Sequence, residues 1–335
     1  MAFLLSRFFT LFALLFSLFS SSLFAQEPSR NFVFKGGPEG GTVHHLANGL
    51  STVLTQNMRE VSFFYEPSKG DSVGSKANIK HISLKEADFG IAYSGDLYLA
   101  IQNDKEIPAK NVHALAYLFG SPVHLVVRAD SSIKSVFDLA GKKVGVGPTG
   151  GGPSIVAERF FKSIGLWEKI TPVGCNYKRM AQVMASGELD AVWVFAGHPH
   201  PSVMETAKAI PIRILPLDEA ATQGDLAYEH PYYIPVTIPA NTYPGVSYEV
   251  NTFQDSALWV AGAHVEEAVV YEALRQVFAP TNLAFLHSLT PAAKSVSDTA
   301  PLTGIITTIH KGAGRYWGEK GLDTNFANGH FTGSF

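Results

Sequence analysis

Two glycine-rich loops are the segments of this sequence best suited to hold a ligand. The first runs over residues 36–41 and leads into Thr42, and the second runs over residues 147–152 and leads into Pro153 and Ser154. Each follows an apolar run typical of a strand and precedes a helical pattern, so unpaired N–H groups at the helix start point outward. A helix start carries about half a positive charge and attracts carboxylate or phosphate. Two such loops facing each other across a cleft predict an anion site between two lobes.

Glycine loops also serve as plain tight turns in many α/β proteins, and this alternative stays open for each loop taken alone. A nucleotide-phosphate site is not expected, because neither loop ends in the Gly-Lys-Ser/Thr sequence that binds phosphate and magnesium.

Histidines do not add a metal site here. His44 and His45 follow the first loop, and His198 and His200 alternate with prolines, but no acidic, His-rich loop completes a coordination shell. The sequence also lacks the Gly-x-Ser-x-Gly turn and the HExxH helix that place a nucleophile or a metal beside a base. We therefore expect no enzyme activity, no metal and no cofactor, with the histidines in the cleft lining or in hydrogen-bonded loops.

Arginine is the strongest carboxylate anchor among the side chains, because its guanidinium can donate two parallel hydrogen bonds. Arg59, Arg128 and Arg179 lie near predicted element ends. We expect Arg128 to be structural and select no arginine as a ligand. Among the aromatic residues, Phe195 is expected in the sheet core, and either Tyr232 or Tyr233 is a candidate to hold the closed form.

The elements that position these residues alternate between strands and helices, which predicts α/β layering around a largely parallel sheet. The strands are predicted at residues 32–34, 63–65, 89–92, 115–119, 123–127, 143–146, 191–195, 212–215 and 257–261. The helices are predicted at residues 43–54, 75–85, 136–139, 154–164, 180–186 and 266–278, with Gly165 capping the helix before it. Residues 228–245 contain four prolines and predict an extended connector that returns the chain to the first lobe.

The N-terminus has the pattern of a secretory signal peptide. Arg7 precedes an apolar run over residues 8–19, and a serine cluster then leads to Ala25. We predict cleavage after Ala25, which makes residues 1–25 the signal peptide of a periplasmic protein. An uncleaved membrane anchor is the alternative, although the run is shorter than the roughly 20 residues that a bilayer requires.

The remaining chain is large enough for two lobes, since about 310 residues exceed what one core usually organises. Its single cysteine, Cys175, cannot form an intramolecular disulfide. A net charge of −3 with dispersed lysines excludes the basic face that nucleic acid requires.

Several ordered motifs, spread over nearly all of the mature chain, resemble the TAXI family of solute-binding proteins, which serve tripartite ATP-independent periplasmic (TRAP) transporters. They are Gly-Gly-Thr at 40–42, KEADFGIA at 85–92, HLVVRADS at 124–131, IKS at 133–135, DLAGKKV at 138–144, the loop at 147–152, GELDA at 187–191, AGHP at 196–199, TYPG at 242–245 and HKGAGRY at 310–316. The resemblance implies a two-lobed periplasmic binding protein of type II, a Venus-flytrap clamp with the ligand cleft between the lobes. The lobes are then residues 26–122 plus 232–335, and residues 123–231.

Carried over position by position, the family's cleft motifs imply a set of ligand-binding residues. They fall on Gly41, Thr42, Gly74, Ser75, Asn78, Tyr93, Ser94, Gly150, Gly151, Gly152, Ala196, Gly197, Pro199 and Tyr243. The chain departs from the family pattern where Tyr93-Ser94-Gly95-Asp96 replaces a Gln-Ser-Asp run and where Pro153 replaces a threonine. Both changes remove polar groups, which favours a ligand bulkier or less polar than glutamate.

The function that the resemblance implies is that of a substrate receptor for a TRAP transporter. The receptor is expected to act as a monomer, to capture a small organic anion such as a carboxylate, a dicarboxylate or an amino acid like glutamate, and to deliver it to membrane permease subunits. A receptor of an ABC importer or of a sensor system is the alternative within the binding class. A periplasmic hydrolase is the alternative from another class, and it would need an activated nucleophile.

Overall fold

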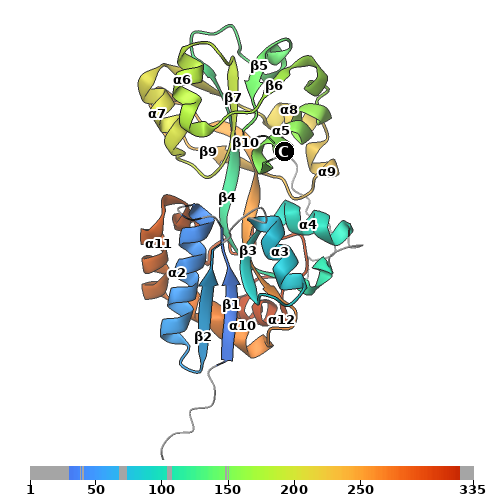
Figure 1. Ribbon diagram of the computed structural model, residues 1–335, viewed down its shortest axis with the longest axis vertical. Helices are drawn as coiled ribbons and strands as arrows, with labels where there is room; N and C mark the ends of the chain where they lie inside the picture. Colours follow the sequence, from blue (N-terminus) through green and yellow to red (C-terminus); the bar gives the residue numbers. More distant parts are fainter. Residues whose placement is uncertain are drawn as a thin grey trace, which may run out of the picture.

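A computed structural model of the chain describes residues 30–37, 39, 41–67, 74–103, 108–147, 149 and 151–324. The elements form two lobes joined by two long antiparallel strands (Figure 1). The predicted signal peptide, residues 1–25, lies outside the described residues. Within the described ranges, no helix is both long and apolar enough to cross a membrane.

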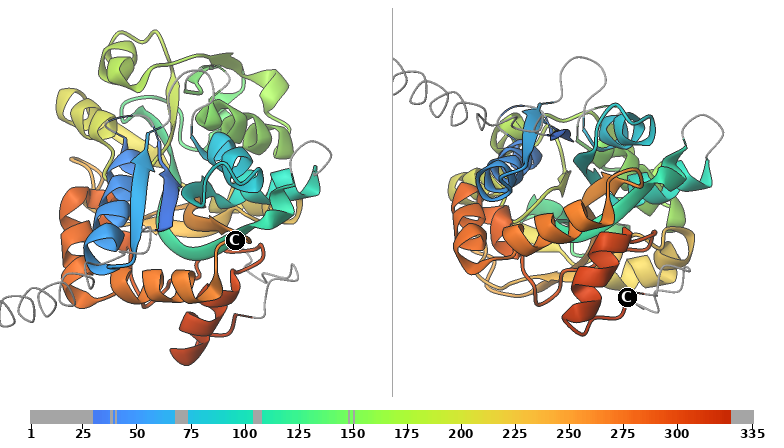
Figure 2. Two further views of the ribbon diagram at one scale, coloured as in Figure 1. Left: turned by 60° about the horizontal axis from the view of Figure 1, so that its bottom comes forward. Right: turned by 90° about the horizontal axis from the view of Figure 1, so that it is seen from below.

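The first lobe combines the N-terminal strands with helices from both ends of the chain. Its elements are β1 (Arg30–Lys35), α2 (Thr42–Asn57), β2 (Val61–Glu66), α3 (Ser75–Ser83), β3 (Phe89–Tyr93), α4 (Ser94–Gln102), α10 (Glu267–Val277), α11 (Pro280–Leu289) and α12 (Lys311–Glu319). Alternation in β1 buries Phe32 and Phe34 against Phe89. Seen from below, α10 and α12 cover the underside of this lobe (Figure 2).

The second lobe repeats the alternation of strands and helices. Its elements are β5 (Lys143–Gly145), α5 (Gly152–Ser163), β6 (Thr171–Val173), α6 (Met180–Ala185), β7 (Ala191–Phe195), α7 (Pro201–Ala209), β8 (Ile212–Leu215), α8 (Asp218–Gln223), α9 (Leu226–Glu229) and β9 (Ile234–Ile238). Helix α5 packs Phe160 and Phe161 against Trp193 of β7. The left-handed φ of +66° at Gly165 confirms the predicted glycine cap after this helix.

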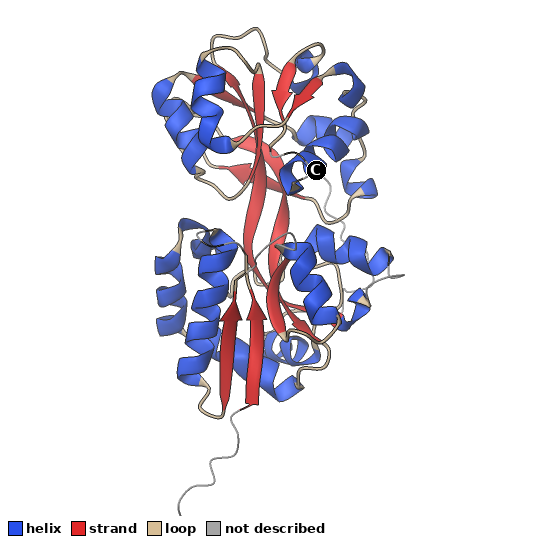
Figure 3. Cartoon of the chain, viewed as in Figure 1, coloured by secondary structure: helices blue, strands red, loops and turns tan. Residues whose placement is uncertain are grey.

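Two strands run through both lobes, β4 (Val112–Arg128) and β10 (Val250–Gly262), and they are the long arrows at the centre of Figure 3. The sheet order is β2-β1-β3-β10-β4-β7-β5-β6, with β8 on β4 and β9 on β10. The prediction of separate strands at 115–119 and 123–127 is wrong, because β4 is continuous. Pro122 lies where β4 leaves β10, and Val123 begins the pairing with β7. A proline interrupts little at this changeover of partners.

The proline-rich segment 228–245 packs within the second lobe instead of crossing to the first. Strand β9 pairs with the first half of β10, and Tyr232, Tyr233 and Tyr243 lie in the cores of the second lobe. The return crossing is made by β10, which was predicted only at 257–261. The part of β10 before residue 257 contains Gln254 and Asp255, and these polar residues do not fit the pattern of a buried strand. The lobe boundary at residue 232 stays a prediction, and the packing favours a later crossing.

Candidate functional site

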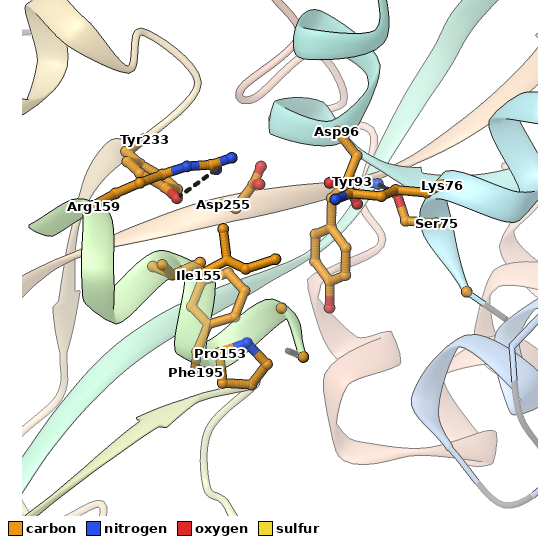
Figure 4. Close-up of a pocket in the computed structure, with 14 residues that line it drawn as sticks. Ser75, Lys76, Tyr93, Asp96, Pro153, Ile155, Arg159, Phe195, Tyr233 and Asp255 are labelled. Carbon is orange, nitrogen blue, oxygen red and sulfur yellow. Dashed lines mark hydrogen bonds between the residues drawn. The ribbon is translucent and has the colours of Figure 1, made fainter. Parts of the chain in front are cut away.

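A cavity of about 490 Å³ lies between the lobes, where the starts of three helices converge (Figure 4). The first lobe contributes the start of α3 and the junction of β3 with α4, and the second lobe contributes α5, the end of β7 and one tyrosine. The lining residues are Gly74, Ser75, Lys76, Tyr93, Asp96, Gly151, Gly152, Pro153, Ile155, Val156, Arg159, Phe195, Tyr233 and Asp255.

Arg159 is the principal cation of this cavity. It lies on α5, and its Nη1 donates a 3.3 Å hydrogen bond to the Tyr233 hydroxyl while its Cζ stands 5.9 Å from the Tyr232 ring centroid. Among the described residues it forms no ion pair with a carboxylate. A guanidinium has five N–H donors, so most of them remain available to an anion in the cavity.

The N-terminal end of helix α5 adds a partial positive charge next to Arg159. Its N-cap residue, Gly151, provides no side chain to cap the first N–H groups, and Pro153 stands in the first turn, where a missing N–H costs nothing. The N–H groups of Ser154 and Ile155 donate to the Gly151 carbonyl oxygen, at 3.1 and 3.2 Å, and the first residues of the helix line the same cavity as Arg159. The α5 segment therefore presents both a charged donor and the positive end of a helix.

Asp255 of β10 lies on the cavity floor, between Arg159 and the residues of the first lobe in Figure 4. Its Oδ1 accepts hydrogen bonds from the backbone N–H of Ser256 at 2.7 Å and of Gly95 at 3.2 Å. The side chain is buried, and this burial, followed by the negative charge of Asp96, raises the pKa of the Asp255 carboxyl well above its usual value.

Aromatic rings from both lobes form the apolar part of the lining. The Tyr93 ring centroid lies 6.1 Å from that of Phe195, and the Tyr93 hydroxyl is 2.9 Å from Ser121 Oγ. Burial raises the pKa of Tyr93 to about 12, so the phenol stays neutral. Phe195, expected in the sheet core, ends β7 half-buried and lines the cavity.

Five of the predicted ligand-binding residues line this cavity, namely Gly74, Ser75, Tyr93, Gly151 and Gly152. Ser75 Oγ accepts a 2.8 Å hydrogen bond from the backbone N–H of Tyr93, which fixes the start of α3 beside the start of α4. Gly74 has φ +78° and ψ −155°, a conformation that only glycine adopts readily. In this cavity, the first-lobe counterpart of the α5 start is therefore the start of α3, at Gly74 and Ser75.

Three predicted residues of the first lobe lie away from the cavity lining. Gly41 and Thr42 stand at the start of α2, outside this cavity. Ser94 is buried and its Oγ donates to the carbonyl oxygen of Gly304 at 2.7 Å. The face-to-face arrangement of the two glycine loops is thus not reproduced in this lining.

Asn78 and Tyr243 are buried and bonded within the protein. Asn78 Nδ2 donates to the carbonyl oxygens of Gly36 and Ile91, at 3.1 and 2.8 Å. The Tyr243 hydroxyl lies 2.9 Å from His124 Nε2 and accepts a 2.8 Å hydrogen bond from the His200 backbone N–H. Their ligand contacts stay predictions.

The remaining predicted residues lie elsewhere. Gly197 and Pro199 line a second cavity of about 720 Å³, which also includes Lys294 of the first lobe. Ala196 is half-buried and packs against the core of the second lobe. Gly150 lies outside the described residues.

Four charged residues of the cavity were missed in the sequence, namely Lys76, Asp96, Arg159 and Asp255. Arg159 stands seven residues after Gly152, about two helical turns along the same face, so helical periodicity from the second loop could have found it. Asp255 is an acidic residue buried within β10, and its position next to an apolar run was the available signal. The prediction that this strand starts at residue 257 left Asp255 outside it.

Comparison with known proteins identifies the fold and the family. The structure resembles a TctC solute binding protein from Polaromonas, with a TM-score of 0.52 and 13% identity, covering 78% of this chain and 89% of that one. It also resembles the periplasmic sulfonate-binding protein of a putative sulfonate ABC transporter from Methylobacillus flagellatus KT, with a TM-score of 0.51 and 18% identity, covering 78% and 72%. These likenesses show the two-lobed α/β fold of periplasmic binding proteins. A profile of the NMT1-like family matches residues 34–321, most of the chain, and the protein therefore belongs to the NMT1-like family.

Proposed function

We propose that this protein is an exported solute receptor that captures a small organic anion between its lobes and delivers it to the permease of a TRAP transporter. The observation that carries the proposal is Arg159, a cation without a carboxylate partner among the described residues, facing a cavity between two lobes. The start of α5 supports the same ligand charge, since the positive end of the helix dipole lies at this cavity. The predicted signal peptide supports an extracytoplasmic location.

Capture requires no covalent chemistry. A ligand that contacts Arg159 on one lobe and the Ser75 region on the other binds the closed arrangement of the lobes more tightly than the open one, and so shifts the equilibrium toward closure. Gly74, Ser75, Tyr93, Gly151 and Gly152 are the predicted contacts that we retain for this cavity. Closure would then present the surface that the permease recognises.

Native mass spectrometry of protein purified without refolding, followed by a thermal-shift screen, tests the ligand class. The screen would include monocarboxylates, dicarboxylates, sulfonates, amino acids and neutral sugars. A ligand that binds only the folded protein raises the melting temperature as its concentration increases. Shifts confined to acids support the proposal, and shifts confined to neutral compounds contradict it.

Uptake in the organism that produces this protein tests the transporter class. A strain without this chain should lose uptake of the radiolabelled acid found in the screen. With a TRAP permease, collapse of the ion gradient abolishes uptake, and depletion of ATP at constant gradient leaves it unchanged. The opposite pattern would assign the receptor to an ABC importer.

A further inference from the structure

Asp255 is held in the cavity in a way that favours its neutral form. Arg159 is the cation that acts on its carboxyl group, and within the described part of the chain the two side chains form no ion pair. A buried carboxylate without a cationic partner is costly, so such groups keep their proton. The Asp255 side chain also lies near Asp96 of α4, whose negative charge opposes a second one.

The hydrogen bonds of Asp255 indicate that Oδ2 is the oxygen that carries the proton and can donate it in a hydrogen bond. Oδ1 accepts the short bond from Ser256 N–H, whereas Oδ2 accepts only a 3.3 Å bond from Gly95 N–H. The Cβ of an alanine at position 95 would lie 2.7 Å from Oδ2 and 2.6 Å from the Tyr232 ring, so glycine allows this close packing. A neutral Asp255 is then a hydrogen-bond donor built into the cavity floor.

The fixed charges of the cavity leave room for one negative charge on the ligand. With Asp255 neutral, Arg159 and Lys76 oppose the single carboxylate of Asp96. Lys76 is exposed at the rim, and Tyr93 and Tyr233 are neutral phenols. A dianion would leave an uncompensated negative charge between the lobes. An amino acid carries an added ammonium group and no net charge, so it would leave one positive charge of the lining uncompensated.

Apart from Ser75 and the glycines, the rest of the lining consists of rings and aliphatic groups. Tyr93, Phe195 and Tyr233 contribute rings, and Ile155 and Val156 contribute branched aliphatic groups. A neighbouring cavity of about 410 Å³ shares Lys76, Asp96 and Arg159 with the first and extends between α3 and α4. A ligand anchored at Arg159 can therefore extend an apolar body along these walls.

We infer that the captured solute is a monoanion with an apolar body, whose acidic group binds Arg159 and accepts a hydrogen bond from the neutral carboxyl group of Asp255. This inference rests on the proposed function, because it narrows the class of anion that the receptor takes. The inference predicts that the receptor prefers monocarboxylates to dicarboxylates and amino acids of similar size.

Isothermal titration calorimetry at pH 7 with four probes tests the inference. The probes are 4-methylpentanoate and 3-phenylpropanoate as monoanions, leucine as the same branched skeleton with an ammonium group, and glutarate as a dianion of similar length. We expect at least one monoanion to bind at least tenfold tighter than both leucine and glutarate. If leucine or glutarate binds more tightly, or if neither monoanion binds, the inference is overturned while the anion receptor stands. The receptor itself fails only if no acid in the wider screen binds.

Two variants at position 255 test the protonation state. Asp255→Asn keeps the shape, the Oδ1 acceptor and a donor, so it should bind the preferred monoanion within about threefold of the wild-type affinity. Asp255→Leu removes the donor and should weaken binding at least tenfold. If Asp255→Asn folds normally but loses binding, an ionised Asp255 is required and the inference is wrong. Because that variant is nearly isosteric, the test does not depend on whether Asp255→Leu folds.

Discussion

The rings of Tyr93 and Phe195 meet across the gap between the lobes, with centroids 6.1 Å apart and planes inclined by 44°. Tyr93 ends β3 of the first lobe, and Phe195 ends β7 of the second. Both residues belong to the lining of the cavity between the lobes. The cavity is therefore bounded by a pair of aromatic residues of which each lobe supplies one.

Removal of one of these rings should weaken ligand binding more than it weakens the fold. Phe195→Ala removes apolar surface from the cavity, which should cost roughly 1–2 kcal/mol of binding free energy, or about tenfold in affinity. Calorimetric titration with the preferred acid measures the change. Phe64→Ala is the matched control, because Phe64 is 51% exposed on β2, outside the cavity lining, and its loss should leave affinity unchanged. Equal affinities for wild type and Phe195→Ala would contradict this role.

Gly95 should tolerate no side chain. The added methyl group of Gly95→Ala would lie 2.6 Å from the Tyr232 ring and 2.7 Å from Asp255 Oδ2, so the packing must shift at a cost of roughly 1–3 kcal/mol. Chemical denaturation measures the free energy of unfolding. Gly318→Ala is the control, since a methyl group added at this position of α12 meets no atom within 4 Å and should be neutral or slightly stabilising. A Gly95→Ala protein as stable as the control would refute the close packing.

His124 should make the protein less stable in acid. Burial lowers the pKa of His124 to about 3, whereas an unfolded histidine has a pKa of about 6.5. The unfolded chain therefore binds the proton first, and the contribution of His124 is complete above pH 6.5 and is lost as the pH falls toward 3. The loss between pH 7 and pH 5 should be roughly 2 kcal/mol.

Unfolding free energies measured at pH 7 and pH 5 test this prediction with His124→Gln. The variant removes the titrating group, so its stability should fall less between the two pH values than that of the wild type. His45→Gln, at an exposed position, should keep the wild-type difference. Identical pH dependence in wild type and His124→Gln would show that His124 is not the sensitive group.

Asp255 should have the opposite pH dependence. Its folded pKa is raised by burial and by Asp96, so its contribution to stability is fully present below the ordinary pKa of a carboxyl group and is lost as pH rises through the folded value. Asp255→Asn has no such loss. The melting temperature of the variant relative to wild type should therefore rise between pH 5 and pH 8, as measured by differential scanning calorimetry. A difference that shrinks over this range would mean that Asp255 is ionised in the folded protein.

The layered α/β fold was predictable because most strands are apolar runs between turns, as in β1 and β7. The continuity of β4 was not, since Gly120, Ser121 and Pro122 have the pattern of a strand break. The strands that pair with β4 explain why β4 stays continuous at these residues. Pro122 pairs with Gln254 at the end of the ladder with β10, just before the pairing with β7 begins at Val123, so its missing N–H interrupts little.

The glycines of the site could be predicted from the sequence more readily than its charged side chains. Gly74, Gly151 and Gly152 follow from loop patterns and from the family resemblance, because glycines mark close backbone approach. Arg159 and Asp255 reach the cavity through the packing of α5 on β7 and through the path of β10 between the lobes. These tertiary relationships join positions that are distant in the sequence.

Titration of the tightest-binding acid from the screen into wild type, Arg159→Gln and Arg128→Gln tests the central claim most directly. Charge-assisted hydrogen bonds contribute roughly 1.5–3 kcal/mol, so Arg159→Gln should bind about 10- to 100-fold more weakly with little change in stability. Arg128 pairs with Asp130 at the surface, and Arg128→Gln should bind like wild type. If Arg159→Gln retains the wild-type affinity for the acid, the anion is not held at Arg159 and the proposed site is wrong.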